Sequence, residues 1–289
     1  MIMKKKLIVS GDSVSDLEFR SSAHPEMDTS WPKWPEYVAK HLDMELVCLA
    51  RGGQGNTFVY STLLDKITTT PKEEIGLVIA GWSQAHRRDW QSFKGNLSNH
   101  PMDSISGQFY QKHSWMSNIN DMRDHKNNIE SHTKKSLREM HSFQILCERY
   151  DLPYLQFQTG HLFEDWWNDK QFHFQNDKDA IDSLKTNRVI LEVSRHFKTN
   201  RNKVTKVKKS IRRCLDIILS YENIIDTNRF IGWPLSYNIG GFDLENKIIG
   251  DSYKQKAKRG LYISEKDYHP NRLGQKAIGE FIIEFYENL

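Results

Sequence analysis

A serine near the start of the sequence and a histidine near its end are the residues best suited to catalysis. Ser13 ends the triplet Gly-Asp-Ser, which follows the apolar run 7–9. His269 lies far downstream, in the stretch Asp-Tyr-His-Pro-Asn at 267–271. A serine hydroxyl becomes a nucleophile when a base within hydrogen-bond reach takes its proton, and histidine is the commonest such base. The pair therefore predicts nucleophilic catalysis, if the fold brings the two segments together.

Two glycine-containing turns follow other apolar runs. Residues 51–56 read Arg-Gly-Gly-Gln-Gly-Asn after the run 45–50, and residues 81–84 read Gly-Trp-Ser-Gln at the end of the run 76–81. Glycine permits unusual backbone angles and lets backbone N–H groups approach a reacting carbonyl closely. These turns are therefore candidates for the groups that stabilise a negative charge during catalysis.

Apolar runs alternate with segments of helical periodicity along the chain. The predicted strands are 7–9, 45–50, 76–81, 154–158 and a run near 224–231, and the predicted helices are 34–42, 57–66, 211–219 and about 273–286. The alternation predicts the α/β class, as a three-layer α/β/α sandwich with a central parallel sheet in flavodoxin-like strand order. Such a sheet brings the carboxyl ends of its strands, and hence the turns above, to one edge.

The length of 289 residues fits one domain, 1–289, that carries insertions. Residues from about 90 to 130 are polar and predict a long irregular excursion, and residues from about 165 to 215 predict a helical lid or subdomain. The second stretch ends in a basic run, 195–213, with nine Lys and Arg residues and no acidic one. This run suits either a solvated helix face, which we favour, or contact with a polyanion such as nucleic acid.

The composition, with 38% hydrophobic and 27% charged residues, is that of a soluble globular protein. No stretch approaches the roughly 20 apolar residues that span a bilayer, and the apolar run after Lys4-Lys5-Lys6 is too short for a signal peptide. The cysteines, Cys48, Cys147 and Cys214, are odd in number and lack metal-site spacing, which favours a reducing, cytoplasmic setting.

Typical motifs for cofactor and metal binding are absent from the sequence. The sequence contains no phosphate-binding loop and no Gly-x-Gly-x-x-Gly dinucleotide motif. Its 12 histidines are scattered without the spacing of a ligand set. We therefore expect neither a cofactor nor a metal.

The four segments around 13, 53, 83 and 269 occur in the order of the four sequence blocks of the SGNH hydrolases, also called GDSL esterases, and the chain resembles this family. The resemblance implies a serine esterase that works through a covalent acyl-enzyme. By resemblance Ser13 is the nucleophile, His269 the base and Asp267 the carboxylate that orients it. The oxyanion hole would combine the backbone N–H groups of Ser13 and Gly53, with Gly52 as the alternative to Gly53, and a side chain of the third block.

The chain departs from the family in two blocks. Where most members have Gly-x-Asn-Asp, this chain has Gly-Trp-Ser-Gln, so Ser83 or Gln84 must supply the side-chain donor of the oxyanion hole. The usual Asp-x-x-His spacing would put the acid at Lys266, whereas Asp267 lies two residues before His269. If Asp267 does not reach the imidazole, a Ser-His dyad remains.

Four further residues are candidates for substrate binding: Asp12, Asn56, Trp82 and Arg87. Asp12 suits either a turn-holding role, which we favour, or direct acid–base work. Trp82 suits packing or a stacking platform equally well.

We predict a serine hydrolase that cleaves a carboxylic ester of a small molecule or a glycan. Carbohydrate O-acetyl esters, lipids and small acyl esters all lie within the range that the resemblance implies. Two alternatives stay open: a catalytically degenerate member that binds a glycan or protein, motivated by Ser83 and Gln84, and a virion-associated or nucleic-acid-associated protein, motivated by the basic run 195–213.

Overall fold

The computed structural model describes residues 4–85, 87, 89–91, 97–98, 129–160, 162, 212–236, 239–250 and 253–289. The two predicted insertions, at about 90–130 and 165–215, lie almost entirely outside the described residues. So does most of the basic run, of which Arg212 and Arg213 are described.

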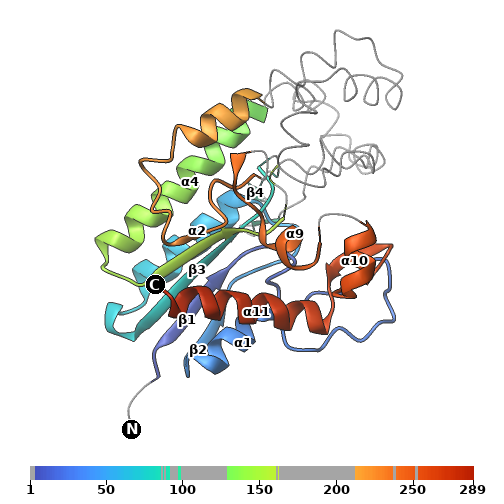
Figure 1. Cartoon of the computed structure of the whole chain (residues 1–289). Helices are drawn as coiled ribbons and strands as arrows, with labels where there is room; N and C mark the ends of the chain where they lie inside the picture. Colours follow the sequence, from blue (N-terminus) through green and yellow to red (C-terminus); the bar gives the residue numbers. More distant parts are fainter. Residues whose placement is uncertain are drawn as a thin grey trace.

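A five-stranded sheet forms the centre of the fold (Figure 1). Its strands are β1 (Lys6–Ser10), β2 (Glu45–Cys48), β3 (Ile75–Trp82), β6 (Tyr154–Gln158) and β7 (Phe230–Ile231). The spatial order is β2-β1-β3-β6-β7, and all four pairings are parallel. This is the predicted flavodoxin-like order. All eight residues of β3 are buried, as expected of a central strand that is covered on both faces.

Helices cover both faces of the sheet, so the predicted three-layer α/β/α sandwich is confirmed (Figure 1). On one face, α1 (Trp34–His41) and α11 (Arg272–Glu287) bury Trp34, Val38, Ile278 and Ile282 against the sheet. On the other face, α2 (Asn56–Thr69) and α4 (Ile129–Arg149) bury Val59, Leu63, Leu137 and Phe143 against the sheet. None of the described helices has both the length and the apolar character needed to cross a bilayer.

Short elements complete the described part of the chain. They are the 3-10 turn η1 (Lys72–Glu74), the two-residue strands β4 (Trp90–Gln91) and β5 (Leu97–Ser98), the helices α9 (Leu244–Ile248) and α10 (Tyr253–Arg259), and the strands β8 (Tyr262–Ser264) and β9 (Asp267–Pro270). Residues 212–219 are also helical, within the predicted segment 211–219.

The segment 267–271 passes from a strand into the N-cap of a helix. Residues Asp267–Pro270 form strand β9, which pairs antiparallel with β8. Asn271 then caps α11, because its side-chain oxygen accepts a hydrogen bond from the backbone N–H of Gly274 at 3.0 Å. The cap fixes the point at which the strand passes into the helix.

Candidate active site

Ser13, His269 and Asp267 form a continuous hydrogen-bonded chain. Ser13 Oγ lies 2.8 Å from His269 Nε2, and His269 Nδ1 lies 2.6 Å from Asp267 Oδ1. Ser13 follows β1, whereas the other two residues lie on β9. The fold thus brings together the two segments that the sequence singled out, although most of the chain separates them. Both contacts are within the range of strong hydrogen bonds.

The strand conformation of β9 explains why Asp267 works from two residues before His269. Successive side chains of a strand point to opposite faces, so residues i and i+2 share a face. Asp267 and His269 therefore lie side by side. The backbone N–H of His269 also donates to Asp267 Oδ1, at 3.0 Å, which ties the carboxylate to the same residue twice.

The pair is electrostatically coupled. Burial raises the pKa of Asp267, but hydrogen bonds from His269 and from the Ser21 hydroxyl outweigh it and hold the pKa below its ordinary value of 3.8. Burial lowers the pKa of His269, but the hydrogen bond and charge of Asp267 outweigh it and hold the pKa above 6.5. The imidazole is thereby tuned to accept a proton. Sequence reasoning missed Ser21, because it lies in a connection without periodicity or motif.

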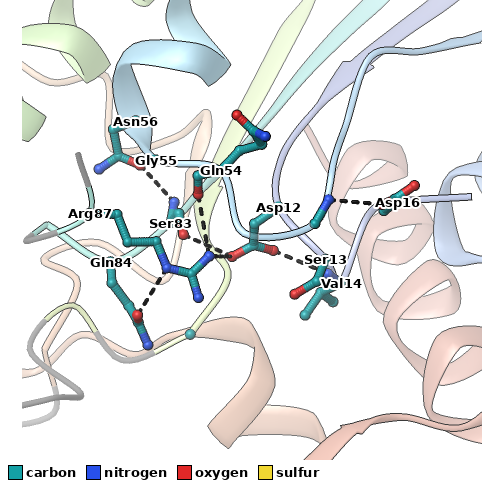
Figure 2. Close-up of polar contacts among 12 residues, drawn as sticks. Asp12, Ser13, Val14, Asp16, Gln54, Gly55, Asn56, Ser83, Gln84 and Arg87 are labelled. Carbon is teal, nitrogen blue, oxygen red and sulfur yellow. Dashed lines mark hydrogen bonds and ion pairs between the residues drawn. The ribbon is translucent and has the colours of Figure 1, made fainter. Parts of the chain in front are cut away.

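The turn after β2 lies against Ser13. A Cβ atom on Gly52 would lie 3.7 Å from Ser13 Cβ. The N–H of Gly52 donates to Asp16 Oδ2 at 2.8 Å (Figure 2), whereas the N–H groups of Ser13 and Gly53 meet no protein acceptor within the described part of the chain. Gly53 has a φ of +78°, a conformation that favours glycine. Gly53, unlike Gly52, therefore has a backbone N–H group that can donate to another group.

In the third block, the hydroxyl of Ser83 already has a partner within the protein. The buried Ser83 uses its single hydroxyl proton on Asp12 Oδ2, at 2.9 Å, so this hydroxyl is not available to an oxyanion. The N–H of Ser83 donates to Asn56 Oδ1 at 2.7 Å (Figure 2). Gln84 accepts a hydrogen bond from Arg87 Nε at 3.1 Å. Ser83 thus holds the loop together from inside.

Two of the four candidate substrate contacts are turned into the protein. Trp82 is fully buried, and its Nε1 donates to Gln156 Oε1 at 3.0 Å. Asn56 is buried as well, and its Nδ2 donates to Ser136 Oγ at 2.9 Å while its Oδ1 binds the Ser83 N–H. A side chain without exposed surface cannot contact a substrate, so Trp82 and Asn56 support the site from beneath.

Arg87 and Asp12 form the charged part of the site. Arg87 Nη1 lies 3.5 Å from Asp12 Oδ2 and 3.3 Å from the carbonyl oxygen of Gln54. Asp12 Oδ1 accepts the N–H of Val14 at 3.1 Å, so Asp12 holds the loop that carries Ser13. Figure 2 shows the guanidinium reaching toward Asp12, next to Ser13. With 18% of its side chain exposed, Arg87 keeps a face toward solvent.

Asp89 connects this loop to α2. Its two carboxylate oxygens accept the backbone N–H groups of Gly55, at 2.7 Å, and Phe58, at 2.8 Å. Gly55 is the N-cap residue of α2 and has no side chain to fill this role. Asp89 thus caps the helix from a remote segment and fixes the turn that contains Gly53.

We expect Asp89→Ala to lower the free energy of unfolding by about 1–2 kcal/mol, because two helical N–H groups lose their acceptor. Asp89→Asn keeps one acceptor oxygen and should lose less. Urea unfolding curves measure the stability of both variants. Asp65→Ala is the control, because Asp65 is an exposed residue of the same helix. An unchanged stability of Asp89→Ala would contradict the capping role.

A cavity of about 350 Å³ adjoins the turn that follows β2. Asp16, Leu17, Leu49, Arg51 and Phe58 are among its lining residues. Asp16 is also the residue that accepts the Gly52 N–H, so the cavity opens close to the loop that carries Ser13.

Comparisons with known proteins give structural matches alone. No protein-family model and no curated protein matches the chain. Similar solved structures include a protein of Desulfitobacterium hafniense DCB-2 assigned to the G-D-S-L family of lipolytic proteins, with 11% identity, coverage of 97% of this chain and 99% of that chain, and a TM-score of 0.46. A protein of Slackia heliotrinireducens assigned as an SGNH hydrolase has 8% identity, coverage of 98% of both chains and a TM-score of 0.38.

A third match is the lipase Lip_vut3 from a goat rumen metagenome, with 11% identity, coverage of 97% of both chains and a TM-score of 0.42. The family that the sequence blocks resemble is thus also named in the descriptions of the first two structures.

Proposed function

We propose that this protein is a serine hydrolase that cleaves carboxylic esters of a small molecule or a glycan through a covalent acyl-enzyme at Ser13. One observation carries the proposal: Ser13 Oγ, the His269 ring and the Asp267 carboxylate are joined by contacts of 2.8 and 2.6 Å. A hydroxyl, a base and a carboxylate that orients the base are the parts that acyl transfer needs.

In the first half-reaction, Ser13 Oγ attacks the ester carbonyl carbon while His269 Nε2 takes the hydroxyl proton. Asp267 stabilises the resulting imidazolium. The tetrahedral intermediate then expels the alcohol, which leaves with the proton from His269. In the second half-reaction, a water molecule attacks the acyl-enzyme, again with His269 as the base, and the carboxylic acid departs as Ser13 regains its proton.

The backbone N–H groups of Ser13 and Gly53 are the proposed donors to the oxyanion. For the side-chain donor we assign Arg87 in place of Ser83, because Ser83 spends its proton on Asp12, whereas Gln84 Oε1 accepts from Arg87 Nε and so orients the guanidinium. A guanidinium has five N–H groups, and the contacts of Arg87 with Gln84, Asp12 and Gln54 use those of Nε and Nη1. Its remaining nitrogen can then donate to the substrate.

A cysteine nucleophile is disfavoured. Burial raises the pKa of the Cys48 thiol to about 11 and that of the Cys214 thiol to about 11, and it raises the pKa of Cys147 as well. A thiol attacks as its thiolate, which is scarce near neutral pH at such pKa values.

We expect Arg87→Met to lower kcat by about 10²–10³-fold, the usual cost of losing one oxyanion donor. Arg87→Lys should recover part of the loss, since it keeps the charge but not the fork of donors. Steady-state kinetics with an activated aryl ester measure both, with the exposed Arg138 as control in Arg138→Met. A kcat unchanged in a folded Arg87→Met protein would remove Arg87 from the oxyanion hole.

The test of the proposed function is covalent labelling with a fluorophosphonate, which reacts with activated serines. The folded protein should be labelled once, on the peptide that contains Ser13, and heat-unfolded protein should not be labelled. Absence of labelling in folded protein would favour the second candidate, a non-catalytic binding protein. That candidate draws on the altered third block, in which Ser83 no longer offers its hydroxyl.

A further inference from the structure

The connection between β1 and α1 contacts the β8–β9 hairpin at three points beside the triad. The Ser21 hydroxyl donates to Asp267 Oδ2. The Phe19 ring packs on the His269 ring with 4.3 Å between centroids. His24 Nε2 lies 2.6 Å from Ser264 Oγ. We call residues 19–24 the clamp, because they hold the hairpin that carries the catalytic base.

The direction of the Ser21 hydrogen bond is fixed by its second partner. The backbone N–H of His24 donates to Ser21 Oγ at 3.1 Å, so an oxygen lone pair is used there and the single hydroxyl proton is free for Asp267. An ionised carboxylate only accepts. Ser21 is 3% exposed and Asp267 is 7% exposed, so bulk water cannot take over if the hydroxyl is removed.

Each carboxylate oxygen of Asp267 has a separate task. Oδ1 accepts both N–H groups of His269, and Oδ2 accepts the Ser21 hydroxyl. A carboxylate rotates readily about its last side-chain bond, and such a rotation would take Oδ1 away from the imidazole. Ser21 opposes this rotation because it fixes the far oxygen.

We propose that Ser21 is a positioning residue of the catalytic centre: it locks the Asp267 carboxylate, and through it the His269 ring, in the orientation that activates Ser13. The inference rests on the hydrolase function proposed above. It extends the triad to four side chains joined by hydrogen bonds, of which two, Ser13 and Ser21, come from the segment that follows β1.

The first test compares four variants by steady-state kinetics. Ser21→Ala should lower kcat roughly ten- to a hundredfold, the range seen when a partner that orients a functional side chain is lost, with KM almost unchanged. Ser21→Thr keeps the hydroxyl and should restore most of kcat, and Ser21→Cys, a weaker donor, should fall between. Ser22→Ala is the matched control, because Ser22 is the adjacent, exposed serine.

A double mutant separates positioning from a general effect on the fold. Because Ser21 acts through the carboxylate, Ser21→Ala should add little to the loss already caused by Asp267→Asn. Fully multiplicative losses, or an unchanged kcat in folded Ser21→Ala, would overturn the proposal.

An NMR measurement tests Ser21 without any substrate. The Nδ1 proton of His269 should give a downfield resonance in the unmodified protein, in Ser22→Ala and in Ser21→Thr, and this resonance should be lost or broadened in Ser21→Ala. This pattern in a protein that hydrolyses no ester would leave Ser21 as a positioning residue and reject the hydrolase. An active enzyme whose resonance does not change in Ser21→Ala would support the hydrolase and reject Ser21 as a positioning residue.

Discussion

Ser13→Ala should lower the kcat of ester hydrolysis by about 10⁴-fold or more, the scale of loss when a serine nucleophile is removed. Without Oγ no acyl-enzyme forms, and any remaining rate comes from water attacking an ester that the oxyanion donors polarise. The 2.8 Å contact with His269 Nε2 disappears as well, but the base and its carboxylate stay together on β9.

Initial rates with a p-nitrophenyl ester, together with fluorophosphonate labelling, measure this loss. Thermal unfolding should show that the variant remains folded, and Ser22→Ala serves again as the exposed control. Retention of more than about one per cent of kcat, in a preparation free of other esterases, would mean that another residue is the nucleophile.

Asp267→Asn should lower kcat by about 10⁴-fold, the effect seen when the acid of a serine triad becomes an amide. The amide keeps the shape of the carboxylate but loses its charge, and its NH₂ group permits a hydrogen bond to the wrong tautomer of His269. The buried Ser21 hydroxyl also loses its charged acceptor. The rate of fluorophosphonate labelling at Ser13 should fall with kcat.

The pH profile of the same variant has a defined direction. His269 must be neutral to take the Ser13 proton, and its pKa lies above 6.5 because Asp267 outweighs the effect of burial. Activity of the unmodified protein should therefore fall as the pH drops through a midpoint above 6.5. In Asp267→Asn the two largest influences that raise this pKa are lost, and only the charges of Glu245 and Asp12 still oppose burial, so the midpoint should move to lower pH. A midpoint that does not move would show that Asp267 does not control the pKa of His269.

The same coupling bears on stability. The pKa of Asp267 is lowered by folding, so its contribution is present above the unfolded value of 3.8 and is lost as the pH falls through the folded pKa. The pKa of His269 is raised by folding, so its contribution is complete below 6.5 and is lost as the pH rises through the folded pKa. Both contributions are therefore present together between 3.8 and 6.5.

Much of the fold could be predicted because its strands are buried on both faces. Predicted strand 154–158 coincides with β6, and the predictions for β1, β2 and β3 differ from the structure by one or two residues at their ends. The prediction near 224–231 was too long, because residues 221–228 form turns before β7. Turn-forming backbone cannot be distinguished from a strand by apolar content alone.

Helix α4 was not predicted, although the sequence held a signal for it. Leu137, Met140, Phe143 and Cys147 recur at helical spacing and are fully buried. Polar residues between them, such as Glu139, which accepts a hydrogen bond from Thr57 of α2, masked the apolar stripe. The periodicity was present, but the mean hydropathy of the segment was too low to draw attention to it.

In the site, contacts between remote segments were beyond sequence reasoning. The Gly-Asp-Ser and Asp-Tyr-His stretches mark their own positions, but nothing marks Ser21 as a partner of Asp267 or Asp89 as the cap of α2. Ser83 and Gln84 were alternative donors to the oxyanion, and nothing in the sequence indicates that the Ser83 hydroxyl has a partner in Asp12, which follows another strand. A hydroxyl group can donate its single proton to one acceptor, and the tertiary structure determines which acceptor lies within reach.

The contact between Ser13 and His269 also sets the order in which the protein can become chemically competent. On the ribosome, the proposed nucleophile is translated 256 residues before the imidazole that would activate it. In the proposed hydrolase, Ser13 stays an ordinary alcohol until β9 brings His269 into contact with it. A polypeptide that ends before position 269 therefore carries Ser13 without its base, and the synthesis and docking of β9 supply that base.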